Sequence, residues 1–208
     1  MIRDNEKSEP PEPPSNEETG VDTECLKRLL RLSHIFSSVV REVLETKLLG
    51  ESSALPLSLS QFHLLKLMTL NGRHQVGELA DFLGVSPPAA SKNLDKLERF
   101  GLVVRTPSKG DRRVILLSAS RKGQRLVQKC EAMKEERLSS VVGQMSKEEI
   151  KQLSDLLEKF SVSLLSREET PRGFCLRCAA YIETGCPVGH VRGGCPYDRV
   201  REGQTADV

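Results

Sequence analysis

The chain has 208 residues and a nearly balanced charge, with 31 lysines and arginines against 29 aspartates and glutamates. Its length suits one domain of ordinary size with appendages. The sequence shows neither an apolar run of about 18 residues nor a signal-peptide pattern, so we expect a cytoplasmic protein with no membrane partner. It also shows no nucleophile elbow, phosphate-binding loop or zinc-hydrolase motif, and an enzyme is therefore not indicated.

Composition divides the chain into three parts. Residues 1–22 are acidic and proline-rich with almost no apolar side chains, which predicts a disordered tail. Residues 23–166 have the apolar periodicity of a folded domain. Residues 167–208 begin with a polar stretch and then become rich in cysteine and glycine.

Two helical stretches open the central domain. Residues 24–49 carry apolar side chains at helical spacing, residues 50–57 resemble a loop, and residues 58–71 supply the next helix. The stripe on the first helix is broader than a small domain buries alone. It consists of Leu26, Leu29, Leu30, Ile35, Phe36, Val39, Val40, Val43 and Leu44.

A short helix and a tight turn come next. Leu79, Ala80 and Leu83 are spaced as on one helical face, and the small side chain of Ala80 allows a second helix to approach. Gly84 supplies the left-handed conformation that ends a helix tightly. The pattern predicts the first half of a helix-turn-helix.

The second helix of this pair has one apolar and one polar face. Ser86 is placed to cap it, and Pro87 and Pro88 fall in its first turn, where missing N–H groups cost little. The apolar face carries Ala90, Leu94 and Leu97, and the opposite face carries Pro88, Lys92, Asp95, Lys96 and Arg99. Such a helix suits the major groove of DNA, although an ordinary solvated amphipathic helix has the same pattern.

A basic hairpin follows the two helices. Gly101 ends the second helix, residues 102–106 and 114–118 read as strands, and residues 107–111 have turn chemistry. The tip presents Lys109, Arg112 and Arg113 beside Asp111. Arginine at such a tip can enter a narrow minor groove, whereas the alternative is a generic charged hairpin. After two helices of this kind, the hairpin favours a winged helix-turn-helix.

The apolar pattern of residues 121–165 predicts a further helical region with a break at residues 143–147. Ser146 and Glu149 form a capping box that restarts the helix. Its apolar stripe is again broad, and a second copy of the chain is the expected partner because two-fold dimers are the commonest oligomers. Such a dimer would match a palindromic DNA site. The stripe comprises Leu126, Val127, Leu138, Val141, Val142, Ile150, Leu153, Leu156, Leu157 and Phe160.

The run LERFGLVVRTPSKGDRRVILLSASRKG, residues 97–123, resembles the signature of the MarR family of winged-helix regulators, and the similarity extends over residues 26–165. The resemblance implies a mainly α fold with a small β wing, a DNA-binding core at 58–119, and dimerisation helices at 24–49 and 120–165. It further implies that residues 86–96 form the recognition helix, that Arg113 enters the minor groove and that Asp111 orients it. Pro87 and Pro88 are unusual for the family at this place. The implied DNA contacts are Ser86, Pro87, Pro88, Ala89, Ser91, Lys92, Lys96, Lys109, Asp111, Arg112 and Arg113. The resemblance also implies double-stranded DNA as partner, a homodimer and a small-molecule effector.

The cysteine-rich tail departs from the family. Four of the six cysteines follow the spacing Cys175-x2-Cys178-x7-Cys186-x8-Cys195. A segment with so few large apolar groups needs a staple, and disulfides are disfavoured in the cytoplasm. The pattern therefore predicts a metal centre held by these four thiols, with reduced thiols without metal as the alternative.

Two kinds of metal centre fit four cysteines. Zinc takes four thiolates, but most zinc ribbons have a second C-x2-C pair, which this tail lacks. Cysteine followed by proline, as at Cys186 and Cys195, occurs in ferredoxin motifs and favours a [4Fe–4S] cluster over zinc. His190 is an alternative zinc ligand. Cys25 lies where some MarR-like hydroperoxide sensors place a reactive thiol. Those sensors surround the thiol with tyrosines, whereas this chain has only Tyr181 and Tyr197, both in the tail, which favours a structural or incidental cysteine.

The sequence leaves three functions open. We expect a MarR-type transcriptional regulator that binds a palindromic operator as a homodimer and is modulated by the metal centre of its tail. The first alternative is a DNA-binding or interaction protein that zinc stabilises without redox sensing. The second is an electron-transfer iron–sulfur protein, which would not need the wing.

Overall fold

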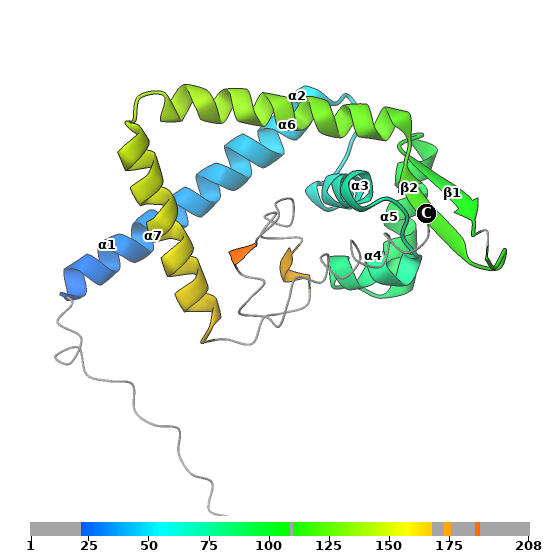
Figure 1. The fold of residues 1–208 in the computed structure, drawn as a ribbon, viewed down its shortest axis with the longest axis horizontal. Helices are drawn as coiled ribbons and strands as arrows, with labels where there is room; N and C mark the ends of the chain where they lie inside the picture. The colour runs from blue at the N-terminus through cyan, green and yellow to red at the C-terminus, as the bar shows by residue number, and fades with distance from the viewer. Residues whose placement is uncertain (1–21, 109, 168–172, 176–185, 188–208) are drawn as a thin grey trace, which may run out of the picture. The chain divides into compact units, whose positions relative to one another are not determined.

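The computed structural model describes residues 22–108, 110–167, 173–175 and 186–187, and Figure 1 traces its helices and strands. This part is mainly helical with a two-stranded antiparallel sheet, as the sequence predicts. The helices before the sheet are α1 (Thr23–Val39), the π-helix η1 (Val40–Lys47), α2 (Leu48–Ser52), α3 (Leu59–Asn71), α4 (Val76–Leu83) and α5 (Pro87–Arg99). Strands β1 (Val103–Pro107) and β2 (Ile115–Ala119) follow, and then α6 (Arg121–Val142) and α7 (Lys147–Leu165).

The chain divides into two compact units, residues 1–42 and residues 43–208. In the first unit the carboxylate of Asp22 caps α1 by accepting a hydrogen bond from the backbone N–H of Glu24 at 3.3 Å. No residue of α1 is buried by the described part of the chain. Its large apolar side chains are 42 % to 60 % exposed, namely Leu26, Leu29, Leu30, Leu32, Ile35, Phe36 and Val39.

The helix predicted over residues 24–49 is divided into three and extends farther than expected. The prediction that a loop begins at Gly50 is wrong, because α2 continues to Ser52. Leu48 and Leu49 are buried where α2 packs against α6. This packing outweighs the weak helix preference of glycine.

The core of the second unit is built around α3. This helix contacts α4, α5, α6 and β2, and it lies between α6 and the α4–α5 pair in Figure 1. Because α3 has neighbours on several sides, it is apolar around most of its circumference. Its buried apolar side chains are Phe62, Leu64, Leu65, Leu67 and Met68. It begins with a capping box between Ser58 and Gln61.

The helix-turn-helix forms as predicted. Gly84 has φ 67° in the left-handed region and ends α4. Ala80 is 1 % exposed, which is consistent with a close approach of the two helices. Ser86 is the N-cap residue of α5, with Pro87 and Pro88 in the first turn, but the expected side-chain capping bond is not made.

The wing is a hairpin in which Val103 pairs with Ala119 and Pro107 pairs with Ile115. Each strand begins and ends one residue later than predicted. His74 forms an isolated antiparallel β-bridge with Leu117 of β2. The backbone N–H of His74 donates to the carbonyl of Leu117 at 2.9 Å, and the carbonyl of His74 accepts from the N–H of Leu117 at 2.8 Å. The sheet is therefore joined to the segment between α3 and α4.

The helical region after the wing begins at a close contact. A Cβ on Gly123 would lie 2.3 Å from the carbonyl oxygen of Leu102, so only glycine allows α6 to pass the wing this closely. The predicted capping box of Ser146 and Glu149 is confirmed at the start of α7. None of the described helices has the length and apolar character needed to cross a membrane.

Candidate nucleic-acid interface

Helix α5 separates a buried face from an exposed one. Ala90, Leu94 and Leu97 are fully buried, as the spacing predicts. Of the predicted DNA-contact residues on α5 and its cap, Ser86, Pro87, Pro88 and Lys92 are exposed, while Ala89, Ser91 and Lys96 are half-buried. The end of the helix that would enter a groove is thus accessible.

A pair of amides attaches α5 to α3. The side-chain N–H of Gln61 donates to the side-chain oxygen of Asn93 at 3.2 Å, and the amide of Asn93 donates to the carbonyl of Ala89 at 3.2 Å. Gln61 is buried, so this polar contact lies under the helix rather than on its surface. Sequence reasoning missed it because the two residues are 32 positions apart.

Lys96 forms its contacts with other residues of the domain. Its ammonium donates to the carbonyl oxygen of Pro56 at 2.8 Å and lies 5.7 Å from the centre of the Phe100 ring. The prediction that it contacts DNA would require it to exchange this bond for one to a phosphate. Among the lysines of α5, Lys92 is the exposed one.

The wing tip is held by the side chain and backbone of Asp111. Its carboxylate accepts from the backbone N–H of Arg113 at 2.9 Å, and its carbonyl accepts from the N–H of Val114 at 2.9 Å. The carboxylate therefore fixes the backbone that carries Arg113, and both Arg112 and Arg113 are exposed. The predicted contact Lys109 lies outside the described residues.

Arg105 joins the wing to α5. From β1 its guanidinium forms ion pairs with Asp95, and with Glu98 at 3.0 Å from Nε. Asp95 and Glu98 lie one turn apart on α5, and a guanidinium offers the forked donors that two carboxylates can share. This contact fixes the strand relative to α5. The signal in the sequence is the acidic pair of α5 followed by a lone arginine in the strand.

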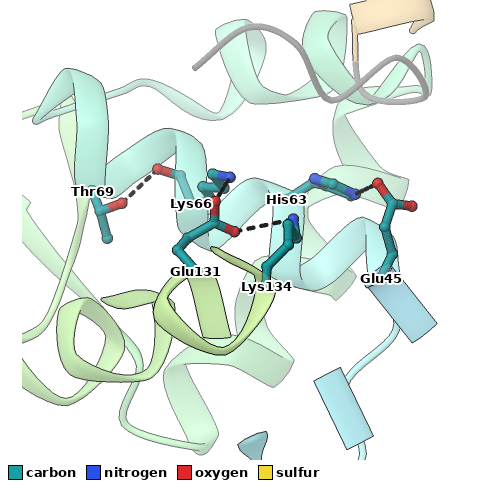
Figure 2. A network of polar contacts seen from close by, with 6 residues as sticks. All are labelled: Glu45, His63, Lys66, Thr69, Glu131 and Lys134. Carbon is teal, nitrogen blue, oxygen red and sulfur yellow. Dashed lines mark hydrogen bonds and ion pairs between the residues drawn. The ribbon is translucent and has the colours of Figure 1, made fainter. Parts of the chain in front are cut away.

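A group of polar side chains lies around α3 (Figure 2). The ammonium of Lys66, on α3, is buried and donates to the carboxylate of Glu131 on α6. Lys134 donates to the same carboxylate at 3.2 Å. On another side of α3, the ring of His63 lies 4.0 Å from the carboxylate of Glu45. These contacts link α3 to α6 through Lys66 and to η1 through His63.

In this group of side chains, burial and ion pairing shift the pKa values of Lys66 and Glu131 in opposite directions. Burial lowers the pKa of Lys66 from 10.5 by more than the bond to Glu131 raises it. Burial also favours the neutral form of Glu131, but the hydrogen bond and charge of Lys66, together with Lys134, lower the pKa of Glu131 below 4.5. Burial determines the net pKa shift of Lys66 but not that of Glu131, because the side chain of Lys66 is 2 % exposed and that of Glu131 is 27 % exposed. Glu131 is therefore a carboxylate at neutral pH.

The described cysteines are dispersed. Cys175 and Cys186 are half-buried, Cys25 is exposed and Cys130 is buried, and burial raises the pKa of the Cys130 thiol. The other predicted metal ligands, Cys178 and Cys195, lie outside the described residues, as does His190. Within the described ranges, no three His, Cys, Asp or Glu side chains gather closely enough to hold a metal ion.

A helix-turn-helix followed by a basic hairpin defines a winged-helix protein. Residues 57–115 match the MarR family, and the chain therefore contains a MarR family domain.

Solved structures have the same fold. YusO from Bacillus subtilis is 22 % identical, with a TM-score of 0.56, over 68 % of this chain and 98 % of its own. A MarR family protein from Bacillus stearothermophilus is 24 % identical, with a TM-score of 0.54, over 73 % and 99 %. FabT of Streptococcus pneumoniae, solved in complex with DNA, is 20 % identical, with a TM-score of 0.57, over 67 % and 99 %. At these identities the likeness establishes the fold.

Proposed function

We propose that this chain is a MarR-type transcriptional regulator that binds double-stranded DNA through α5 and the wing. One observation carries the proposal: the exposed start of α5 and the exposed arginines of the wing belong to one frame, which Arg105 holds together. The similarly folded FabT was solved in complex with DNA, which supports the same partner here. No catalytic role is assigned to any residue.

The two elements would read DNA in different ways. Helix α5 has the size and polarity to enter a major groove, where Ser91 and Lys92 can reach base edges or phosphates. Arg113 at the wing tip suits the narrow minor groove of A·T-rich flanks, where the negative potential is highest. Asp111 supports that contact by fixing the turn.

The regulator would act as a homodimer. Each unit of the chain has an apolar helix face that its own described residues leave uncovered, on α1 in one and on α7 in the other. Exposed apolar surface of this extent is typical of an interface, and a second copy covers it with the same residues by two-fold symmetry. A two-fold dimer fits a palindromic operator with half-sites about 34–36 Å apart.

The test is selection of duplexes from a random pool by the full chain, followed by affinity measurements at one salt concentration. Arg113→Ala should weaken binding to the selected duplex about tenfold, which is the cost of about 1.4 kcal/mol, and most on A·T-rich flanks. Lys151→Ala is the matched control, because it removes one exposed positive charge from α7. Equal affinities of the Arg113→Ala protein and the control would remove the wing from the account.

We further propose that Cys175, Cys178, Cys186 and Cys195 hold a metal centre that modulates DNA binding. Four thiols suit a [4Fe–4S] cluster or zinc equally by donor type, and the Cys-Pro pairs favour the cluster. Visible absorbance and metal analysis of protein purified without oxygen distinguish the two. Colourless, metal-free protein in which all four thiols of the tail are titratable would contradict both. The effector implied by the family resemblance stays a prediction, which a change in operator affinity on ligand addition would test.

A further inference from the structure

Segment 173–175 of the tail lies against the turn that precedes the recognition helix. Gly173 has φ 71°, and a Cβ built on it would lie 2.8 Å from the carbonyl oxygen of Leu83 and 3.2 Å from the Cα of Gly84. The contact is therefore made between two backbones. It excludes every side chain larger than that of glycine, both by space and by the left-handed conformation.

A second contact holds the same segment. Cys175 is half-buried and packs against the apolar core cluster, which includes Ala80, Leu83 and Ala90 of the helix-turn-helix. The segment thus touches the turn with its backbone and the core with a side chain. A contact of both kinds restrains the turn more than either would alone.

The docked segment leaves the DNA-binding face open. Ser86, Pro87, Pro88 and Lys92 remain exposed while Gly173 contacts Gly84. Cys175 packs against the core cluster, to which α5 contributes its buried residues Ala90, Leu94 and Leu97 and not its exposed polar ones. Docking therefore does not compete with DNA for these residues.

We infer that segment 173–175 is an intramolecular clamp, and that the docked state is the one that binds DNA tightly. The clamp restrains the turn between α4 and α5, so the start of α5 loses less freedom when it enters a groove. When the clamp is released, the turn has to become ordered during DNA binding, and this loss of entropy weakens the affinity. The inference rests on the proposed DNA binding and assigns a regulatory contact to the same site.

The clamp couples the docking of Cys175, in the cysteine-rich tail, to the affinity of the chain for DNA. Packing against the core shields the thiol of Cys175 in part, so the thiol should react more slowly in the docked state than in the released state. Because coupling between two sites is reciprocal, DNA should raise the docking equilibrium constant of segment 173–175 by the same factor by which docking strengthens DNA binding, and the thiol should then react more slowly. A metal that draws Cys175 away from the core would open the clamp.

Two variants of the full chain test the inference on a selected duplex. Gly173→Ala should lower affinity about five- to tenfold, at the lower end of common coupling factors. Gly50→Ala is the control, because a Cβ there meets nothing within 4 Å. In protein freed of metal, Cys175→Asp should act like Gly173→Ala, because it places a carboxylate against the core. Circular dichroism verifies that each variant is folded.

A second readout follows Cys175 itself. Iodoacetamide forms a carbon–sulfur bond with the thiolate and displaces iodide, with the thiol proton released to solvent. Peptide mass spectrometry should show slower alkylation of Cys175 when the duplex is present and faster alkylation in Gly173→Ala. Gly173→Ala that binds DNA normally and alkylates at the unaltered rate overturns the clamp and leaves the proposed function intact.

If the unaltered chain binds no duplex, the proposed function fails and the docking is still tested. The N–H of Val85 donates to the carbonyl of Ala80 at 3.1 Å within the restrained turn. Its hydrogen exchange should be faster in Gly173→Ala than in Gly50→Ala. Equal exchange rates overturn the clamp.

Discussion

Helices α5 and α7 have similar amphipathic patterns and different surroundings. In α5 the apolar residues Ala90, Leu94 and Leu97 are fully buried by the rest of the domain. In α7 no residue is buried by the described chain, and Leu156 and Leu164 are 64 % and 58 % exposed. Periodicity indicates that a helix has an apolar face, but it does not identify what covers that face. In the proposed homodimer, a second copy of the chain covers the apolar face of α7.

Helix α6 contains both situations. Near its start Val127 and Cys130 are 6 % and 1 % exposed, whereas Leu138 and Val141 near its end are 46 % and 60 % exposed. The boundary between the self-sufficient core and the uncovered surface therefore lies within one helix.

Leu94→Ala and Leu156→Ala should act on different equilibria. Removing the buried Leu94 side chain should lower the free energy of unfolding by about 2–5 kcal/mol, because a cavity remains in a packed core. Leu156→Ala should leave the fold of one chain unchanged and weaken the dimer. Urea unfolding at several protein concentrations measures the first effect, and sedimentation measures the second.

The unaltered protein gives the first result that could contradict the predictions for Leu94→Ala and Leu156→Ala. A stable monomer of 23.1 kDa at all concentrations would show that the face of α7 is not an interface of this chain. Equal losses of unfolding free energy in the two variants would show that Leu156 is covered within its own chain.

Glu131→Gln should destabilise the core by about 2–3 kcal/mol, below the usual cost of breaking a buried pair because Glu131 is partly exposed. The change leaves the buried ammonium of Lys66 without its counter-charge. Lys134→Ala is the matched control and should cost less than about 1 kcal/mol, since Lys66 still holds the carboxylate. Urea unfolding at neutral pH compares them, and equal losses would remove the special role of the buried pair.

The same carboxylate should make stability depend on acidity. The pKa of Glu131 is lower in the folded chain than its ordinary 4.5, so its contribution is complete above that value. The contribution is lost as the pH falls through the lower pKa of the folded state. The difference in unfolding free energy between the unaltered protein and Glu131→Gln should therefore shrink with acidification. A difference that stays constant would contradict the assigned direction.

Arg105→Ala should have the smallest effect on stability, at most about 1 kcal/mol, because its ion pairs are partly exposed. Operator affinity should fall more than stability does, since the wing loses its attachment to α5. Arg137→Ala removes another half-exposed ion pair, with Glu51, and serves as the control. A loss of affinity no greater than that of the control would contradict a positioning role for Arg105.

The local features were predictable from the sequence, and the long-range ones were not. Gly84, the apolar face of α5 and the capping box of Ser146 depend on neighbours within one or two turns, and each is confirmed. The buried ammonium of Lys66 and the bond of Lys96 to Pro56 depend on residues 65 and 40 positions away.

The missed features share one physical origin. A charged or polar residue on a helix reads as solvent-facing unless its partner on another element is known. His74 also escaped the strand prediction, because a single bridge has no alternation to detect. The cysteine pattern indicates metal chemistry on its own, but the placement of 173–175 against the turn could only come from the structure.

The most direct test of the central claim is the salt dependence of duplex binding. We expect the logarithm of the affinity of the unaltered protein to fall steeply and linearly with the logarithm of salt concentration, because lysine and arginine displace counterions from phosphates. Lys92→Ala should reduce the magnitude of this slope by about one unit if Lys92 contacts a phosphate, whereas Lys151→Ala should leave it unchanged. Binding without a salt slope, or equal slopes together with equal affinities for the two variants, would contradict a DNA interface centred on α5.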